Sequence, residues 1–394
     1  MPLNVALDAT PLQGPQTGIG EFCSRILEEL GRTPGVQAGA FSISRRGRAG
    51  LAGLLPPGVK ALGPPGPGLP ARLVHASWAR WPFPPAEFYT GRVDLVHGTN
   101  FVVPPARKAA MVVTVHDLSP LHFPQFCRPA ARAYPHLVKM AIRRGAWVHA
   151  DSAFVAGEVV EALGVAPERV RTVHLGVTPP ATLPGREPEP DGGEPDGEKG
   201  ARGWRHLLPE WVSSYVLALG RVEPRKDLPT LVRAFDRFAG RHPGLALVIA
   251  GPEGWASDQL AEAVRASPVS DRVLLLGWVD EKTRDALLEG AAVFAYPSRY
   301  EGFGLPPLQA MASGAPVVAS ATGALKEVLG DAAWLVGVGD EGAMANALEN
   351  LLDDDAARRE LTRKGRERAA LYTWGACAAG LVSLYRQATE ESRS

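Results

Sequence analysis

Short, continuously apolar segments alternate with helical patterns along most of the 394 residues, and this alternation constrains the fold more than any other feature. The segments are apolar at almost every position rather than at every second one, as expected for parallel strands that helices cover on both faces. Helical patterns lie between them at 227–241, 258–265 and 281–290. The alternation predicts an α/β protein with parallel sheets. The predicted strands are 3–8, 37–44, 94–97, 111–116, 147–151, 171–174, 215–220, 245–251, 272–277, 293–296 and 316–320.

Two stretches rich in glycine and proline interrupt the alternation. Residues 53–70 contain eleven Gly or Pro residues and are predicted to form a loop. Residues 177–202 contain another eleven, with six acids and no aromatic side chain, so they bury too little apolar surface to offset the entropy of ordering. We therefore expect a linker at 177–210 between two Rossmann-like, doubly wound domains at 1–176 and 211–373, with a cleft between them. Such domains bind ligands at the carboxyl ends of their strands.

The charges balance overall but not along the chain. The 42 basic and 42 acidic residues give a net charge of zero, which disfavours a dedicated nucleic-acid binder. Residues 1–176 contain 18 Lys/Arg and 11 Asp/Glu, a net of +7, and residues 177–394 have a net of −7. The acids of the linker account for much of the second value, but not for the basic surplus of the first half. That surplus indicates an anionic partner or membrane surface on this side.

Cysteine usage and the apolar runs indicate a cytoplasmic protein. Cys23, Cys127 and Cys377 lie far apart, with neither disulfide nor metal-ligand spacing, which suits a reducing compartment. The N-terminal segment reaches Asp8 too early for a secretory signal. The longest uncharged run, 302–325, contains three prolines and a glutamine, so we interpret it as loop, helix and strand rather than as a membrane span.

Two loops of the second half carry groups that could bind an anion. Segment 220–227 follows a predicted strand, and its Arg221 and Lys226 could clamp a diphosphate, although basic loops are often only solvated. In segment 297–311, glycines precede a helix whose first turn would contain Pro306 or Pro307, so backbone N–H groups would point at a ligand from the helix's positive end. Glu301 lies just outside that helix, either facing the ligand or capping the helix.

The first half has two weaker candidates. Gly18 and Gly20 open an amphipathic helix after the first strand, which would let backbone N–H groups approach an anion; a tight turn is the alternative. Cys23 occupies the third glycine position of a dinucleotide fingerprint, so that motif is excluded. His116 ends one strand and His97 ends its neighbour, so His116 could present an oriented imidazole to the cleft or be purely structural.

Segment 298–306, with Arg221 and Lys226 upstream, resembles family 4 of the retaining glycosyltransferases, which have the GT-B fold, and in particular bacterial mannosyltransferases. The resemblance covers nearly the whole chain except 45–90 and the linker. It extends to the segments 17–20, 116–117, 168–174 and 372–374.

The resemblance implies roles for the matching residues. Arg221 and Lys226 would neutralise the donor diphosphate, Glu301 would bind the donor sugar's hydroxyls, and His116 would contact that sugar beside the reacting carbon. The final helix, 374–394, would pack back on the first domain. The resemblance implies further donor-binding residues: Gly18, Gly20, Trp278, Val279, Gly302, Phe303, Gly304, Leu305 and Gln309.

Gln309 departs from the family pattern, because the family has a second glutamate there that binds the ribose hydroxyls. We expect weaker nucleotide binding or a shifted preference. The resemblance implies transfer of a hexose, with mannose from GDP-mannose as the first expectation, with retention, no metal and no cofactor besides the nucleotide sugar. The run 353–355 is interpreted as the start of a helix rather than as a metal-binding loop. The alternatives are a catalytically silent sugar-nucleotide-binding protein and a GT-B-fold epimerase.

The acceptor cannot be deduced from the sequence, and neither can the oligomeric state. A basic amphipathic helix is predicted at 129–144 in the domain expected to bind the acceptor. It could rest on an anionic membrane at its inner face while the enzyme serves a lipid-linked acceptor, or simply bury its apolar side in the core. Its cations are Arg128, Arg132, Lys139, Arg143 and Arg144.

Overall fold

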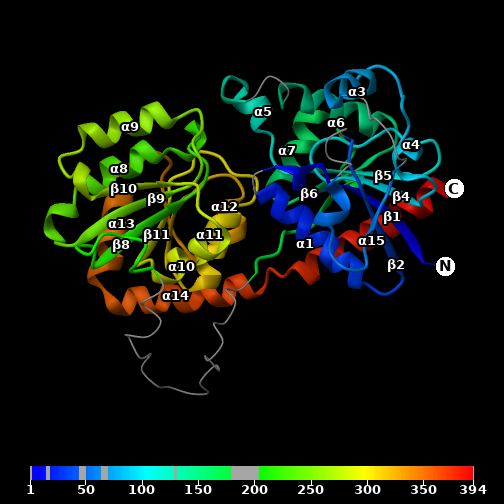
Figure 1. Cartoon of the computed structure of the whole chain (residues 1–394). Coiled ribbons are helices and arrows are strands. Elements are labelled where there is room, and N and C mark those ends of the chain that lie inside the picture. The colour runs from blue at the N-terminus through cyan, green and yellow to red at the C-terminus, as the bar shows by residue number, and fades with distance from the viewer. Residues whose placement is uncertain are drawn as a thin grey trace. The chain divides into compact units, whose positions relative to one another are not determined.

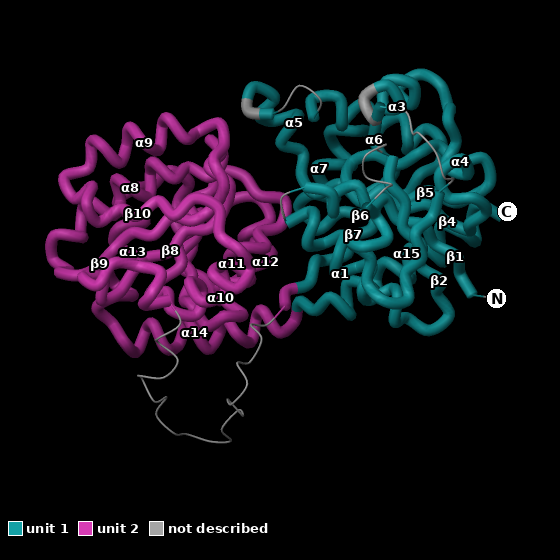
Figure 2. Tube along the Cα trace, in the orientation of Figure 1, with its two compact units in different colours: residues 1–176, 372–394 teal, residues 177–371 magenta. Residues whose placement is uncertain are grey.

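The computed structural model describes residues 2–14, 18–43, 50–63, 70–127, 131–178 and 204–393. Thr17, Arg128 and most of the predicted linker (179–203) lie outside the described residues. The chain divides into two compact units, unit 1 with residues 1–176 and 372–394 and unit 2 with residues 177–371 (Figure 2). Each unit has its own parallel sheet with helices on both faces (Figure 1).

Unit 1 contains a seven-stranded parallel sheet in the order β3-β2-β1-β4-β5-β6-β7. Every residue of β5 is buried, which explains why this strand is apolar without alternation. The strands are β1 (Leu3–Asp8), β2 (Val36–Phe41), β3 (Lys60–Ala61), β4 (Leu95–Gly98), β5 (Ala110–Val115), β6 (Trp147–Ala150) and β7 (Val170–Thr172). The α-helices are α1 (Gly18–Arg32), α3 (Ala71–Trp78), α4 (Glu87–Thr90), α5 (Ser119–His122), α6 (Tyr134–Arg143), α7 (Ala153–Leu163) and α15 (Trp374–Arg393).

Unit 2 contains a six-stranded parallel sheet in the order β10-β9-β8-β11-β12-β13. The strands are β8 (Ser214–Leu219), β9 (Leu245–Ala250), β10 (Val273–Gly277), β11 (Val293–Tyr296), β12 (Val317–Ser320) and β13 (Trp334–Val336). The α-helices are α8 (Leu228–Asp236), α9 (Ser257–Ala266), α10 (Glu281–Gly290), α11 (Leu305–Ser313), α12 (Leu325–Leu329), α13 (Glu341–Asp353) and α14 (Asp355–Ala370).

Local sequence explains where the helices begin and end. The side chain of Ser152 accepts a hydrogen bond from Val155 N at the start of α7, and Gly164 ends that helix in the left-handed region. Asp354 accepts from two backbone N–H groups at the start of α14, so the prediction that the run 353–355 opens a helix is confirmed. In α1 the predicted apolar face, which includes Phe22, is buried.

Two short strands were not predicted. The interpretation of 53–70 as a loop is wrong at β3, a two-residue edge strand whose Lys60 and Ala61 are exposed and therefore carry no apolar signal. The edge strand β13 was missed because it has only three residues, and its Trp334 is exposed. Edge strands have one unpaired side, so they need neither length nor continuous apolarity.

The strand order reverses direction at one point in each sheet. In unit 1 the chain builds outward from β1 to β2 and β3, then returns to place β4 on the other side of β1. In unit 2, β8 lies in the same way between β9 and β11. Loops diverge at such a switch point and leave room for a ligand beyond the carboxyl ends of the strands. The segments that follow β1 and β4, and those that follow β8 and β11, are therefore where a site is expected.

Candidate functional site

The switch point of unit 2 begins with a close approach of two loops. A Cβ atom on Gly251, which follows β9, would lie 1.9 Å from the carbonyl oxygen of Gly220, which follows β8. Both residues also have positive φ angles, +150° and +147°, so only glycine fits without strain. The chain then forms a single 3-10 turn, Pro224–Lys226, before α8.

Lys226 and Glu301 form a buried ion pair at this point. Lys226 Nζ lies 2.5 Å from Glu301 Oε1, and Arg225 Nη1 lies 3.1 Å from the same oxygen. Lys226 also donates a hydrogen bond to the hydroxyl of Tyr296 and lies 4.6 Å from the centre of that ring. Lys226 is 7% exposed and Glu301 is 6% exposed. Two cations thus converge on one buried carboxylate.

The charges of this cluster fix its protonation. Burial raises the pKa of Glu301, but the positive charges of Lys226 and Arg225 lower it further, to about 2, so the carboxylate is ionised. Burial lowers the pKa of Lys226, and the Glu301 charge opposes that effect without cancelling it. Burial also raises the pKa of the Tyr296 phenol well above its usual range, so this group remains a neutral hydroxyl.

The segment after Glu301 opens α11. Gly304 precedes the helix with φ +101°, and Pro306 lies in the first turn, where a missing N–H costs nothing. The N-cap residue of α11 is Gly304, which has no side chain to cap the helix. The Glu301 carbonyl accepts a hydrogen bond from Ala324 N at 3.0 Å, which ties the loop to the start of α12.

The other predicted donor-binding residues of unit 2 follow β8, β10 and β11 or lie in α11. Arg221 donates a hydrogen bond to the carbonyl of Glu253 at 3.3 Å and lies 3.9 Å from Glu223. These groups orient Arg221, whereas Glu301 and Tyr296 orient Lys226. Trp278 follows β10 and is 58% exposed. Val279 is half-buried, and the remaining residues are buried. The buried residues are Gly302, Phe303, Gly304, Leu305 and Gln309.

At the switch point of unit 1, polar side chains follow the carboxyl ends of β4, β5 and β6 and are buried. His116 Nδ1 lies 2.6 Å from Asp151 Oδ2, and His116 Nε2 lies 2.9 Å from the carbonyl oxygen of Thr99. Thr99 Oγ1 in turn donates to the carbonyl of Asp8, the last residue of β1, at 2.5 Å. Burial raises the pKa of Asp8 to about 6.

The start of α1 lies beside His116. Gly18 is the first residue of the helix and is exposed, whereas Gly20 is buried. The ring of Phe22, two residues after Gly20, meets the His116 ring edge to face, with 5.4 Å between ring centres. The loop predicted to bind an anion and the histidine predicted to meet the sugar are therefore neighbours in unit 1.

Sequence reasoning missed four groups that contact the predicted residues. Arg225 was passed over in favour of Arg221, although it contacts Glu301. Tyr296 ends β11 and was counted only as part of a strand. Asp151 and Thr99 follow β6 and β4, and polar residues directly after buried strands were the signal that could have identified them.

The predicted basic amphipathic helix corresponds to α6. Its apolar side is buried in unit 1, with Leu137 and Val138 in the core. Arg144, directly after the helix, donates to the carbonyl of Trp78 at 2.7 Å, and burial lowers its pKa. The amphipathic pattern is thus explained by packing. None of the described helices combines the length and apolarity that crossing a bilayer requires.

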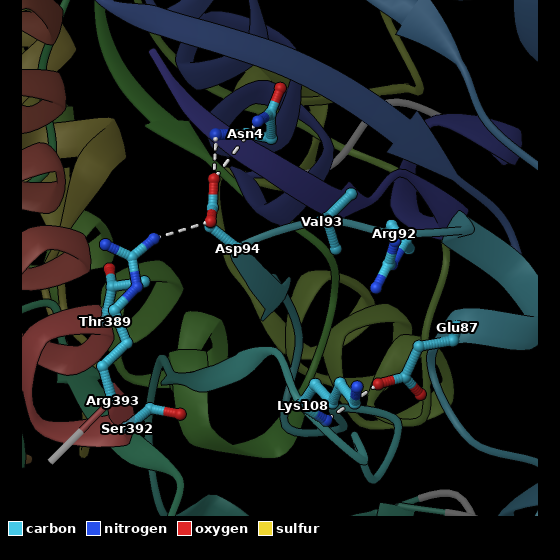
Figure 3. Close-up of a pocket in the computed structure, with 9 residues that line it drawn as sticks. All are labelled: Asn4, Glu87, Arg92, Val93, Asp94, Lys108, Thr389, Ser392 and Arg393. Carbon is cyan, nitrogen blue, oxygen red and sulfur yellow. Dashed lines mark hydrogen bonds and ion pairs between the residues drawn. The ribbon is translucent and has the colours of Figure 1, made fainter. Parts of the chain in front are cut away.

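A separate cavity of about 310 Å³ lies at the opposite, amino edge of the unit 1 sheet (Figure 3). Asp94 accepts from Asn4 N at 2.9 Å and from Arg393 at 2.8 Å, which joins the sheet to the end of α15. Glu87 Oε1 accepts from the backbone N–H groups of Arg107 and Lys108. These groups already satisfy one another, and the fold places ligands at the other edge.

Among the described residues, one group in unit 2 brings three possible metal ligands within 4.8 Å of one another, His242, Glu349 and Asp353. Arg241 already donates to both oxygens of Glu349, at 2.6 Å each. A half-buried carboxylate held in this way by an exposed guanidinium is an ordinary surface ion pair.

Two doubly wound α/β units, one of them with a Lys–Glu–Arg cluster at its switch point, are the arrangement expected of a GT-B-type glycosyltransferase. The family comparisons agree, because residues 212–368 match the family described as "Glycosyl transferases group 1" and residues 18–179 match "Glycosyltransferase Family 4". The chain belongs to the GT-B glycosyltransferases that carry these two domains. The predicted family resemblance and fold class are confirmed.

Curated relatives include mannosyltransferases. O-antigen chain mannosyltransferase B of Escherichia coli is 28% identical over 80% of this chain and 78% of its own length. Phosphatidyl-myo-inositol mannosyltransferase of Mycolicibacterium smegmatis is 36% identical over 43% of this chain and 44% of its own length. D-inositol 3-phosphate glycosyltransferase of Salinispora arenicola is 29% identical over 76% of this chain and 69% of its own length.

Solved structures share the fold at low sequence identity. Sucrose-phosphate synthase from Thermosynechococcus elongatus superposes with a TM-score of 0.69 and 22% identity, covering 98% of each chain. HepE of Anabaena, solved with UDP and glucose, superposes with a TM-score of 0.70 and 16% identity, covering 98% of this chain and all of its own. These likenesses concern the fold.

Proposed function

We propose that this glycosyltransferase is a retaining mannosyltransferase that uses GDP-mannose without a metal ion. The observation that carries the proposal is the buried cluster of Lys226, Glu301 and Arg225 at the switch point of unit 2. Two mannosyltransferases among the relatives support mannose as the sugar. Fixed cations at this place supply the positive charge that a leaving diphosphate needs.

In the proposed donor complex, the diphosphate takes the place of Glu301 as the partner of Lys226, and Arg221 provides the second cation. Glu301 is then free to accept hydrogen bonds from the sugar hydroxyls. The positive end of the α11 dipole, with the backbone N–H of Leu305, faces the same anion in this proposal. The other predicted residues would hold the rest of the donor, with the exposed indole of Trp278 stacking beside the base. These residues are Gly18, Gly20, Val279, Gly302, Phe303, Gly304, Leu305 and Gln309.

The proposed transfer breaks the bond between the anomeric carbon and the diphosphate and forms a bond from that carbon to an acceptor oxygen on the same face. The acceptor's proton passes to the leaving phosphate oxygen. Charge grows on the diphosphate as the bond breaks, and Arg221 and Lys226 stabilise that charge more than the ground state. His116 of unit 1 lies beside the reacting sugar in this proposal.

The acceptor is proposed to bind unit 1, whose first segment has a net charge of +7 and so favours an anionic acceptor. A lipid-linked acceptor would bring the protein to the inner face of the membrane. Co-sedimentation with vesicles of phosphatidylcholine, with and without anionic phosphatidylglycerol, tests this part. Equal recovery in the supernatant with both vesicles contradicts the membrane contact and leaves the transferase activity to be judged separately.

One observation favours a second candidate, a sugar-nucleotide-binding protein without turnover. Gln309 is buried on α11 where the family pattern has a carboxylate, so the nucleotide loses one charged partner. Hydrolysis of the donor without acceptor separates the two functions. An enzyme slowly transfers the sugar to water and releases GDP, whereas a silent binder leaves GDP-mannose intact. An epimerase would instead produce an isomeric sugar nucleotide.

The central experiment offers a panel of nucleotide sugars to the native chain and reads GDP or UDP release by mass spectrometry. We expect release from GDP-mannose and a fall of about 10²- to 10³-fold in Lys226→Ala, the range for removal of one transition-state donor. Lys364→Ala is the matched control, because Lys364 pairs with Asp331 on the surface of the same unit at 3.2 Å. Near-native release by Lys226→Ala contradicts the assignment.

A further inference from the structure

The hydrogen bonds of His116 define its protonation. Its Nε2 faces the Thr99 carbonyl at 2.9 Å, and because a carbonyl can only accept, Nε2 must carry a hydrogen. Its Nδ1 faces Asp151 Oδ2 at 2.6 Å, the length of a charge-assisted bond. The shared proton belongs on the imidazole, because a free imidazole binds protons more tightly than a carboxylate by more than two orders of magnitude. His116 is then a cation with both N–H groups donating.

The neighbouring histidines are neutral, and their hydrogen bonds run in one direction. His149 Nε2 donates to the Val173 carbonyl at 2.9 Å, so its Nδ1 accepts from Thr114 Oγ1 at 2.9 Å. Thr114 therefore accepts from His97 Nε2 at 2.7 Å, and His97 Nδ1 accepts from the hydroxyl of Tyr385 on α15 at 2.7 Å. Burial lowers the pKa of both His97 and His149, which agrees with this pattern.

The other titratable groups around His116 leave Asp151 as its main counter-charge. Asp117 adds a weaker negative charge from the next residue, but its Oδ1 accepts from Ser119 N at 2.9 Å. Cys377, which faces Asp151 from α15, is a neutral thiol because burial raises its pKa. Asp151 Oδ1 is buried without a hydrogen-bond partner, at 3.7 Å from His149 Nε2. The carboxylate thus makes its one hydrogen bond to His116.

We propose that Asp151 is a positioning residue that holds His116 as a doubly protonated cation with a fixed ring orientation. This rests on the proposed function only in taking His116 to lie beside the donor sugar. Held in this way, both N–H groups of His116 stay with Asp151 and Thr99, so the ring keeps a fixed orientation and a positive charge beside the reacting sugar and cannot take up a proton. Burial lowers the pKa of His116, and the Asp151 charge with the two hydrogen bonds raises it further than burial lowers it, in agreement with the geometry.

The protonation is tested on the native chain by nitrogen NMR of ¹⁵N-histidine. At pH 7 we expect His116 to have two protonated ring nitrogens, with its signals identified by their loss in His116→Gln. In Asp151→Asn this imidazole should titrate about 1–2 pH units lower, the usual effect of losing an adjacent opposite charge. Asp94→Asn is the matched control, because Asp94 carries the same charge at the opposite edge of the same sheet. A neutral His116 in the native chain overturns the proposal, and so does an unchanged titration in Asp151→Asn.

The role in the reaction is tested by the pH dependence of kcat/KM for GDP-mannose. In Asp151→Asn, the pH at which activity is lost on the alkaline side should be about 1–2 units lower than in the native chain. Asp94→Asn should have the native profile. An unmoved profile in an active Asp151→Asn overturns the role of Asp151 in positioning His116 for the reaction. If the native chain transfers no sugar from any donor, the proposed function fails, while the NMR titration still decides whether Asp151 holds His116 as a cation.

Discussion

Replacing Glu301 by glutamine leaves Lys226 and Arg225 facing a neutral amide in a buried site. In the native chain both cations lie within 3.1 Å of Glu301 Oε1, and Lys226 is 7% exposed, so water cannot take over the carboxylate's part. Removing one partner of a buried ion pair is costly, because the remaining charge stays desolvated. Unit 2 of Glu301→Gln should therefore be less stable than native unit 2 at neutral pH.

The size of this effect follows from the pKa of Glu301. Burial raises it, and Lys226 and Arg225 lower it further, from the ordinary 4.5 to about 2. At about 1.4 kcal/mol for each tenfold change, this difference corresponds to about 3 kcal/mol of stabilisation by the ionised carboxylate. Because the folded-state pKa lies below the unfolded one, the stabilisation is complete well above pH 4.5 and is lost as the pH falls toward 2.

The assay is urea unfolding at pH 7 and at pH 3, read by a deuterium pulse on peptides from β8 and β11 so that unit 2 is followed by itself. We expect Glu301→Gln to lose about 3 kcal/mol at pH 7 and less than half of that at pH 3. Glu360→Gln is the control, because Glu360 pairs with Arg363 on exposed positions of α14 and should unfold like the native chain. A native midpoint for Glu301→Gln at pH 7, or an equal deficit at both pH values, refutes the reasoning.

Three further substitutions test the sites. Tyr296→Phe removes the hydroxyl that accepts a hydrogen bond from Lys226. A hydrogen bond to a charged group contributes about 1.5 kcal/mol, so turnover of GDP-mannose should fall about tenfold. An unchanged kcat contradicts this. Gln309→Glu should lower the donor KM by restoring a charged partner, and a KM equal to the native value would show that position 309 does not bind the donor. Gly98→Ala would put a methyl carbon 1.9 Å from the Val102 carbonyl, so thermal unfolding of unit 1 should show a loss of about 1–3 kcal/mol.

The parallel α/β architecture could be predicted because the buried strands are apolar at every position. The edge strand β3 lacks this signal, and the edge strand β13 is apolar but has only three residues, so both were missed. The order of the strands within each sheet could not be predicted from the sequence either. Lys226 and Glu301 meet because β11 returns to lie beside β8, although β9 and β10 intervene in the chain. The sequence therefore identified both residues and assigned them to different parts of a ligand, without indicating that they contact each other.

The partner of His116 was missed for a similar reason. Asp151 lies 35 residues later and comes within 2.6 Å because β5 and β6 pair in parallel, with Val115 opposite Ala150. A register of this kind depends on packing of the whole sheet, and a single sequence does not specify it. Polar residues directly after buried strands are the local signal that survives, and they identified His116 correctly as a residue at a strand end.

Unit 1 is made from two separate stretches of chain, and this has a consequence for synthesis on the ribosome. Its helix α15 is translated after unit 2, yet Tyr385 of that helix is fully buried and bonds to His97 in the middle of the sheet. Unit 2 is one uninterrupted stretch, and all of its residues are translated before those of α15. The half of the protein that is translated first is thus the last to complete its core, which reverses the usual N-to-C order of domain folding. A premature stop just before α15 should leave unit 2 folded and unit 1, with His116, unfinished.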